Sequence, residues 1–322
     1  MPEKPAKPLG AGVHDISMDD YLADPCPEPS LNRSIAHVLL TRSPRHAWFA
    51  HPRLNPNWER EHKTAFDLGS TAHALMLGDE RNFAIIDATD WRKTEHKEAR
   101  AKAYKDGKIP LLKDQWENVQ KMVDAGRSQL HDFKDPSVQG VFRDGKPEQT
   151  IIWQEERLWF RVRLDWMPHT ISDEGAVFYD YKTAGASAHP TAWRRALYDH
   201  GYDIQAALYL RGIASVSAWQ LPDSRHLHET RFRFVVQEIQ PPFALSVIEL
   251  TPAALGMAQR RIDEAIRLWS WCLERDKWPG YPPFVMHIDP PVYVESAWLE
   301  HEERRNRALE AGDHELTMLG AG

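Results

Sequence analysis

The sequence has few cysteines, no long apolar run and no excess of positive charge. Its two cysteines, Cys26 and Cys272, lie far apart, which excludes a zinc ribbon or a cysteine-built iron–sulfur cluster and leaves one disulfide at most. No stretch approaches the roughly 18 consecutive apolar residues of a membrane span, and residues 1–12 show no signal-peptide pattern. We therefore expect a soluble protein of the reducing cytoplasm that binds no membrane.

The charge balance is mildly acidic. There are 40 Lys and Arg against 47 Asp and Glu, a formal net charge of −7, which argues against a protein that coats nucleic acid through bulk positive charge. It does not exclude an enzyme that acts on DNA, because a channel can be locally basic and a metal ion supplies positive charge at the phosphate. A hydrophobic fraction of 42% and 13 tryptophans suffice for a sizeable core.

The apolar pattern predicts one α/β domain in which helices come first. Residues 1–29 read as an irregular arm, residues 30–289 as the domain and residues 290–322 as a charged tail that is helical or frayed. Helical spacing is predicted over 35–40 (capped by Asn32 or Ser34), from Ser43 onward, and over 64–77, 115–130, 191–213 and 251–272. Strands are predicted over 149–153, 158–165, 176–182, 231–237 and 244–250.

Two strands carry acidic side chains that plain core strands lack. Asp165 ends one strand, and Asp180 and Lys182 lie on one face of the next because strand side chains alternate. Two carboxylates can hold Mg²⁺ or Mn²⁺, which binds a phosphodiester and activates water. The lysine can orient or deprotonate that water and neutralise developing charge. The alternative for Asp180 and Lys182 is a structural ion pair at a strand end.

Two helices carry further candidates. His73 lies among small neighbours, as a third metal ligand or as a core histidine, and the oxygen-rich set favours Mg²⁺ or Mn²⁺ over Zn²⁺. Gln205 and Tyr209 are spaced i, i+4, and Tyr202 precedes Gln205 by three, so the three share a helix face. They are predicted to contact a phosphate or the water network, unless the helix is an ordinary amphipathic one.

Basic residues near these positions are candidates for DNA contact. They are Arg161, Arg163, Arg194 and Arg195, which are expected to hold the DNA backbone; for the last two, a solvated helix face is an equal alternative. The charged stretch 91–108 is either a solvated surface helix or a mobile basic lid that grips or splits the duplex.

These motifs together resemble a known family. The run from Gly69 to His73, then Asp165, then Asp180 to Lys182, then Gln205 with Tyr209 occurs in the order of RecB-type nucleases of the PDDEXK superfamily. The stretch from 31 to 44 is similar to the family's N-terminal helix. The closest resemblance is to phage RecE-like exonucleases, the exonuclease VIII group. The usual glycine shortly before the first aspartate is missing, and Glu148 matches an acidic position of uncertain role.

The resemblance implies fold, activity and partners. It implies a restriction-endonuclease-like core, with a central mixed sheet flanked by helices and a helical N-terminal portion. It implies an Mg²⁺- or Mn²⁺-dependent exonuclease that degrades one strand of linear duplex DNA 5′ to 3′ for recombination, leaving a tail for a single-strand annealing protein. A ring-shaped homo-oligomer in a bacterial or phage-infected cell is also implied.

The resemblance also assigns roles to residues. His73, Asp165, Asp180 and Tyr181 belong to the metal site, Lys182 lies at the nucleophilic water, and the Gln205 and Tyr209 pair gives support. Two other functions keep the same residues or the same fold. One is an endonuclease that cuts structured or nicked DNA, and the other is a catalytically silent DNA-binding scaffold.

Overall fold

The computed structural model describes residues 8–59, 68–78, 83–106, 108–169, 176–220 and 230–312, with the side chains of 217–220 left out. The chain forms two compact units, Met1–Gly280 and Tyr281–Gly322. The division between them falls earlier than the boundary predicted at residue 289. Each unit is described by itself.

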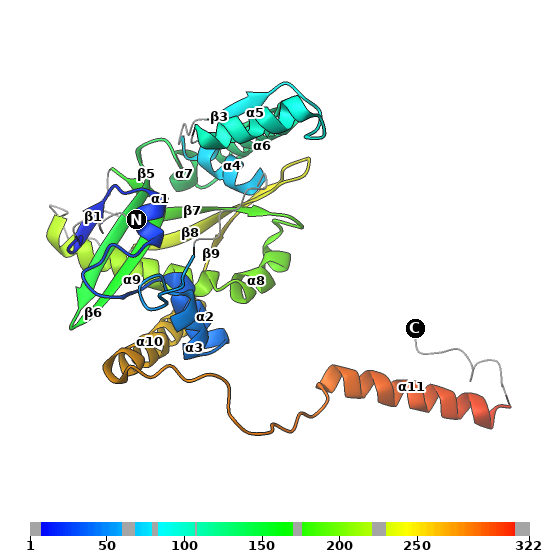
Figure 1. Cartoon of the computed structure of the whole chain (residues 1–322). Coiled ribbons are helices and arrows are strands. Elements are labelled where there is room, and N and C mark those ends of the chain that lie inside the picture. Colours follow the sequence, from blue (N-terminus) through cyan, green and yellow to red (C-terminus); the bar gives the residue numbers. More distant parts are fainter. Residues whose placement is uncertain are drawn as a thin grey trace. The chain divides into compact units, whose positions relative to one another are not determined.

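A mixed sheet forms the centre of the first unit (Figure 1). Its strands are β1 (Gly12–His14), β2 (Ser30–Leu31), β5 (Gly145–Glu155), β6 (Leu158–Pro168), β7 (Val177–Ala184), β8 (Arg231–Glu238) and β9 (Leu245–Glu249). The spatial order is β1-β5-β6-β7-β8-β9, and β2 pairs with β6. The β7–β8 and β2–β6 pairs are parallel and the others antiparallel. The mixed sheet flanked by helices that was expected from the sequence is confirmed.

Helices cover both faces of this sheet (Figure 1). Those of the first unit are α1 (Met18–Leu22), α2 (Arg33–Thr41), α3 (Pro44–Ala50), α4 (Leu68–Met76), α5 (Thr94–Lys105), α6 (Lys113–His131), α7 (Pro136–Gln139), α8 (Pro190–Asp199), α9 (Tyr202–Gln220) and α10 (Pro252–Arg275). One core cluster joins α2, α8, α9 and α10 to the sheet. A second joins α4 and α6 to the opposite face, where Tyr179, Tyr181 and Val235 are buried.

Capping residues explain one helix start and one break. Asn32, rather than Ser34, caps α2, because its side chain accepts a hydrogen bond from the Ile35 amide at 2.9 Å. The single helix predicted over 191–213 is wrong, since α8 ends at Asp199 and α9 begins at Tyr202. Gly201 lies between them with φ of +65°, a backbone conformation that ends helices and favours glycine.

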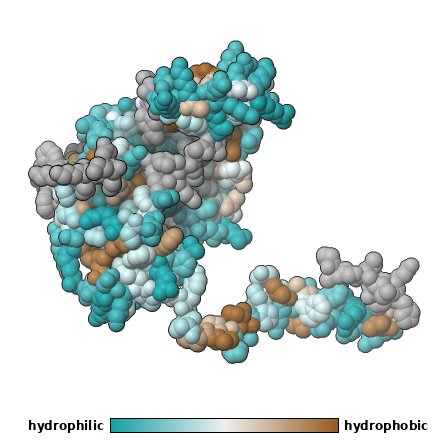
Figure 2. All heavy atoms as spheres, viewed as in Figure 1, coloured by the Kyte–Doolittle hydropathy of each residue, from teal (hydrophilic) through white to brown (hydrophobic). Residues whose placement is uncertain are grey.

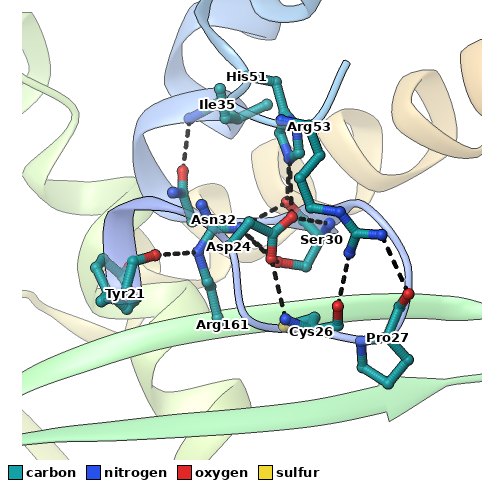
Figure 3. A network of polar contacts seen from close by, with 10 residues as sticks. All are labelled: Tyr21, Asp24, Cys26, Pro27, Ser30, Asn32, Ile35, His51, Arg53 and Arg161. Carbon is teal, nitrogen blue, oxygen red and sulfur yellow. Dashed lines mark hydrogen bonds and ion pairs between the residues drawn. The ribbon is translucent and has the colours of Figure 1, made fainter. Parts of the chain in front are cut away.

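The predicted irregular arm is in fact ordered over its described residues. β1 adds an edge strand to β5, α1 follows, and Asp24 and Cys26 are buried. Figure 3 shows the reason: Asp24 and Ser30 contact the buried guanidinium of Arg161 on β6, and His51 lies 3.3 Å from the Asp24 carboxylate. Both cysteines are buried free thiols.

The segment between α4 and α6 is a small β-α-β insert. β3 (Phe83–Ile86) pairs in parallel with β4 (Ile109–Leu112), and α5 connects them. The sequence predicted a helix or a lid over 91–108 and missed both strands, which are only four residues long. The ring of Phe83 lies 5.5 Å from that of Trp116 and fixes the insert to α6.

The second unit is α11 (Val292–Glu310), preceded by residues 281–291 without regular structure. Most of its large apolar side chains are exposed (Figure 2): Tyr281, Phe284, Val285, Met286, Ile288, Val292, Tyr293, Val294, Trp298, Leu299 and Leu309. Across the described part of the chain, no helix combines the length and the apolar character needed to cross a membrane.

Candidate active site

The candidate site lies where β6 and β7 separate. Their pairing is confined to Trp166 and Tyr179. On its other side, β6 pairs with β5 along nearly its whole length, but the pairing skips Glu148 and Asp165, which the register places opposite each other. Glu148 has φ of +56°, which is strained for a residue with a side chain. The β5–β6 ladder is therefore interrupted at the position of the first predicted metal ligand.

The interruption changes the direction of side chains on β6. Leu164 belongs to the core cluster on the α9 side, and Met167, three residues later, packs against the same cluster. In a regular strand these two positions face opposite sides, so the alternation shifts between them, at Asp165. Such irregularities re-aim side chains and are common beside active sites.

The re-aimed side chain of Asp165 contacts residues of both β7 and α4. Its Oδ2 accepts a hydrogen bond from the Tyr181 amide at 2.8 Å and lies 2.9 Å from Nε2 of His73 on α4. The carboxylate thus replaces the main-chain acceptor that β6 no longer offers. Since the N–H and C=O of one strand residue point to the same side, the Tyr181 carbonyl also faces this gap. Its phenol points away and donates to Gln237 Oε1 at 2.6 Å.

Asp180 and Lys182 contact each other on β7, as the two-residue spacing predicted. The Lys182 ammonium lies against Oδ2 of Asp180, and Gln205 Nε2 donates to Oδ1 of the same carboxylate. Asp180 is only 1% exposed, so its charge is met by these two partners rather than by water. Gln205 reaches it because α9 packs on this face of the sheet.

The charges of this cluster are unevenly balanced. Burial and the nearby Asp165 carboxylate raise the pKa of Asp180 to about 6, although Lys182 opposes them. Burial would raise the pKa of Asp165 too, but His73 and Lys182 outweigh it and lower that pKa. Burial would lower the pKa values of His73 and Lys182, but the neighbouring carboxylates outweigh it and raise both. Two mutually repelling carboxylates therefore share one lysine and one histidine.

The donor set suits a hard divalent cation. It offers carboxylates of Asp165 and Asp180, the imidazole of His73 and the main-chain carbonyl of Tyr181, the oxygen-rich mixture that Mg²⁺ and Mn²⁺ accept. A cation would also relieve the carboxylate repulsion. Within the described ranges, no three His, Cys, Asp or Glu side chains already surround one metal position.

Glu148 is a site residue whose role the sequence left open. Its Oε1 lies 3.7 Å from Nδ1 of His73, and its Oε2 accepts from Nε of Arg163 at 2.7 Å. Arg163 also donates to the Ile16 carbonyl at 2.8 Å and to Thr150 Oγ1 at 3.2 Å. Glu148 therefore connects the N-terminal segment to the histidine. The acidic residue before a predicted strand was the only sequence signal for it.

Tyr202 and Tyr209 lie on either side of Gln205 along α9. The Tyr202 ring stacks on Trp193 at 5.1 Å, and the Lys182 ammonium lies 5.3 Å from its centroid. Tyr209 is buried edge-to-face against Phe232 at 5.6 Å, and burial raises its pKa. Tyr202 thus contacts Lys182 directly, whereas Tyr209 packs against Phe232 in the core.

Four arginines were predicted to contact DNA, and the structure separates them. Arg161 is 1% exposed and pairs with Asp24 at 3.0 Å, so that prediction is wrong: the guanidinium has no surface to offer a phosphate. Arg163 is 10% exposed and committed to Glu148, which makes it a positioning residue. Arg194 and Arg195 are exposed on α8, and their contact with DNA stays a prediction.

A comparison with protein families decides the classification. The model of a PDDEXK-like domain of unknown function (DUF3799) matches residues 39–283. The chain belongs to this family. The matched range contains β5 to β9 and every candidate metal ligand, so the PDDEXK core expected from the sequence is confirmed, while membership of the RecE-like group stays a prediction.

Comparisons with individual proteins add less. A crystal structure from Eubacterium rectale, described as "Putative exonuclease", is similar with a TM-score of 0.49 and 11% identity, covering 88% of this chain and 98% of that one. No curated protein matches the sequence.

Proposed function

We propose that this PDDEXK-like protein is an Mg²⁺- or Mn²⁺-dependent deoxyribonuclease that degrades one strand of linear duplex DNA from its end, in the 5′ to 3′ direction. The observation that carries the proposal is the half-buried cluster of Asp165, Asp180, Lys182 and His73 at the gap between β6 and β7. Hydrolysis of a phosphodiester requires ligands for a cation and a positive side chain at the reacting phosphate, and the cluster supplies both.

Each residue has a defined task in the proposal. Asp165, Asp180, His73 and the Tyr181 carbonyl would hold the cation, which when bound polarises the phosphate and lowers the pKa of a water. The two aspartates raise the pKa of Lys182, which favours its charged form. Lys182 would act at Nζ as a positive charge that orients the water and offsets charge on the phosphate.

Three residues position this machinery. Gln205 fixes one oxygen of Asp180, which leaves the other toward Lys182. Glu148 lies beside the second nitrogen of His73 and is itself held by Arg163. Outer-shell partners of this kind set the orientation of a ligating imidazole.

Digestion of labelled DNA tests the proposal. A linear duplex labelled at the 5′ or the 3′ end of one strand, and a covalently closed circle, are incubated with Mg²⁺, with Mn²⁺ and with chelator. We expect early release of the 5′ label, gradual shortening of the 3′-labelled strand, an intact circle and no reaction in chelator. Lys182→Ala should lower the rate by about 1000-fold, whereas the exposed Lys277→Ala should match the wild type.

The same experiment separates the alternatives. Cutting of the closed circle at a comparable rate would show an endonuclease. Binding of DNA without cleavage in either metal would show a silent scaffold. Full activity of Lys182→Ala would remove the site assignment, whatever the substrate.

The partners belong to the proposal as well. A ring-shaped homo-oligomer would let an acidic protein enclose DNA in a locally basic channel, and the single-stranded product would pass to an annealing protein. Light scattering during digestion tests the ring, because a monomer that digests DNA processively contradicts it.

A further inference from the structure

The insert between α4 and α6 is more basic than the chain as a whole. Its residues 83–112 contain seven Lys and Arg against five Asp and Glu, whereas the whole chain has fewer basic than acidic residues. α5 lies over β3 and β4 and buries Ala103 toward them. On the sides of the helix turned away from these strands, Lys97, Lys102 and Lys105 are exposed.

The basic and acidic side chains of α5 separate by face. Lys97, Arg100 and Tyr104 follow one another at i, i+3 and i+7, so they form one strip along the helix. Glu95 and Glu98 lie on the opposite side at helical spacing, together with Lys102 and Lys105. One side is therefore basic and aromatic, and the other has balanced charge.

Aromatic rings are built into the basic strip. The guanidinium of Arg100 lies 5.1 Å from the centroid of Trp91 and 5.7 Å from that of Tyr104. Tyr104 is 40% exposed in spite of this contact, and Lys97, about two turns earlier, is exposed. A ring that is held in place and still open to solvent can accept a stacked base, while its cationic neighbours meet phosphates.

The insert is anchored to the helix pair that positions His73. β4 leads directly into α6, the Phe83–Trp116 contact holds β3 on it, and α6 packs against α4 in the second core cluster. Figure 1 shows α4, α5 and α6 together on one side of the sheet. A DNA strand bound to α5 would therefore be held by the same layer of helices that carries His73.

We propose that the strip formed by Trp91, Lys97, Arg100 and Tyr104 binds a single strand of DNA. This proposal rests on the proposed nuclease function, which produces such a strand. Cations alone would suit any polyanion, but cations beside an exposed ring are the pattern that recognises unpaired bases on a charged backbone. The balanced opposite side of α5 lacks the rings and serves as an internal reference.

The test measures binding in the full-length Lys182→Ala background, so that cleavage does not interfere. Fluorescence anisotropy is recorded with a labelled oligonucleotide, single-stranded or annealed, over a series of salt concentrations. One double variant carries Lys97→Gln and Arg100→Gln. Its control carries Lys102→Gln and Lys105→Gln, which remove the same charge from the other side of the same helix.

We expect the strip variant to bind the single strand about tenfold more weakly and to lower the slope of log affinity against log salt by about 1 to 2. The control should stay within about twofold of its parent. Equal losses in both variants would show general electrostatics and overturn the strip. Because Arg100 also supports Trp91, the single Lys97→Gln variant must show the same direction with an unchanged melting temperature.

A third variant tests stacking. Tyr104→Leu should weaken single-strand binding about fivefold or more and leave duplex binding unchanged, since only unpaired bases expose their faces. An equal effect on both DNAs, or none, would overturn the proposal. If the wild type digests no DNA, the proposed function fails; if it digests DNA and the strip variants bind normally, only this inference fails.

Discussion

Strand β6 contributes to two polar clusters, which differ in how completely their charges are paired. Around Arg161, the carboxylate of Asp24 lies 3.0 Å from the guanidinium and accepts from the Ser30 amide at 2.9 Å and the Ser30 hydroxyl at 2.7 Å (Figure 3). Four residues along β6, Asp165 lies close enough to Asp180 for the two carboxylates to repel each other.

The two carboxylates respond in opposite directions. Burial alone would raise the pKa of Asp24, but Arg161 and His51 outweigh it and hold that pKa well below its usual range. Burial and Asp165 raise the pKa of Asp180 to about 6. Similar residue types therefore give a satisfied structural cluster in one place and an electrostatically strained one in the other. The strained cluster is the one that gains from a cation.

The largest expected effect comes from breaking the satisfied cluster. Asp24→Asn leaves the Arg161 charge buried without its partner, and we expect a loss of about 3–5 kcal/mol in the free energy of unfolding, measured by chemical denaturation. Asp263→Asn removes a carboxylate from the exposed pair with Arg211 and should cost less than about 1 kcal/mol. Similar costs for both variants would contradict the comparison.

The equivalent substitution in the strained cluster, Asp180→Asn, should stabilise the protein rather than destabilise it. In the folded protein the Asp180 pKa is about 6, against an ordinary 3.8, so ionised Asp180 destabilises the fold above about pH 6. This penalty shrinks as the pH falls below about 6 and disappears below 3.8, where the carboxyl is protonated in both states. In chelator at pH 8, Asp180→Asn should therefore stabilise the protein by at most about 3 kcal/mol.

Denaturation curves at pH 8 and pH 5 measure this gain. We expect it to shrink at the lower pH and DNA cleavage to be lost at both. A destabilised Asp180→Asn variant in chelator at pH 8 would show that Asp180 is satisfied after all. Added Mn²⁺ should raise the melting temperature of the wild type and not of the variant.

A smaller effect is expected at Glu148, which lies beside the strained cluster. Glu148→Gln removes the carboxylate between Arg163 and His73, so the half-saturating concentration of Mn²⁺ in cleavage assays should rise about tenfold. Glu156→Gln, at an exposed position at the end of the same hairpin, is the matched control and should change nothing. An unchanged metal requirement in Glu148→Gln would make Glu148 purely structural.

The smallest effect is expected from the cation–π contacts, in which one aromatic ring lies against the cation of each cluster. Tyr21 lies 5.4 Å from Arg161 and Tyr202 lies 5.3 Å from Lys182, each contact contributing about 1 kcal/mol. Tyr202→Phe keeps the ring and should keep the cleavage rate. Tyr202→Leu should lower kcat about fivefold with little change in KM. Equal rates for Phe and Leu would exclude a role for the ring at Lys182.

Local patterns in the sequence predicted the parts of the site that depend on local geometry. Alternation on one strand placed Asp180 beside Lys182, and helical spacing brought Gln205 to the same side. The order of β5 to β9 followed from apolar runs and turns. These features need only neighbouring residues for their prediction.

The features that were not predicted depend on contacts between residues that lie far apart in the sequence. Arg161 was assigned to DNA because its partner, Asp24, lies in a Pro- and Asp-rich segment that reads as a loop. The break in alternation at Asp165 depends on the backbone of Glu148, which has a positive φ without being glycine. β1 and β2 are too short for a periodic pattern and are strands only because β5 and β6 offer edges.

The origin of the site residues has a consequence for how the protein folds. Asp165, Asp180, Lys182 and Gln205 belong to consecutive elements over 158–205, so the contacts among them span short stretches of chain and can form early. Asp165 meets Asp180 when β6 docks beside β7 through their short pairing. That docking step brings two negative charges together, so divalent cations in a refolding buffer should accelerate it, making the ligand of the finished site an aid to its assembly.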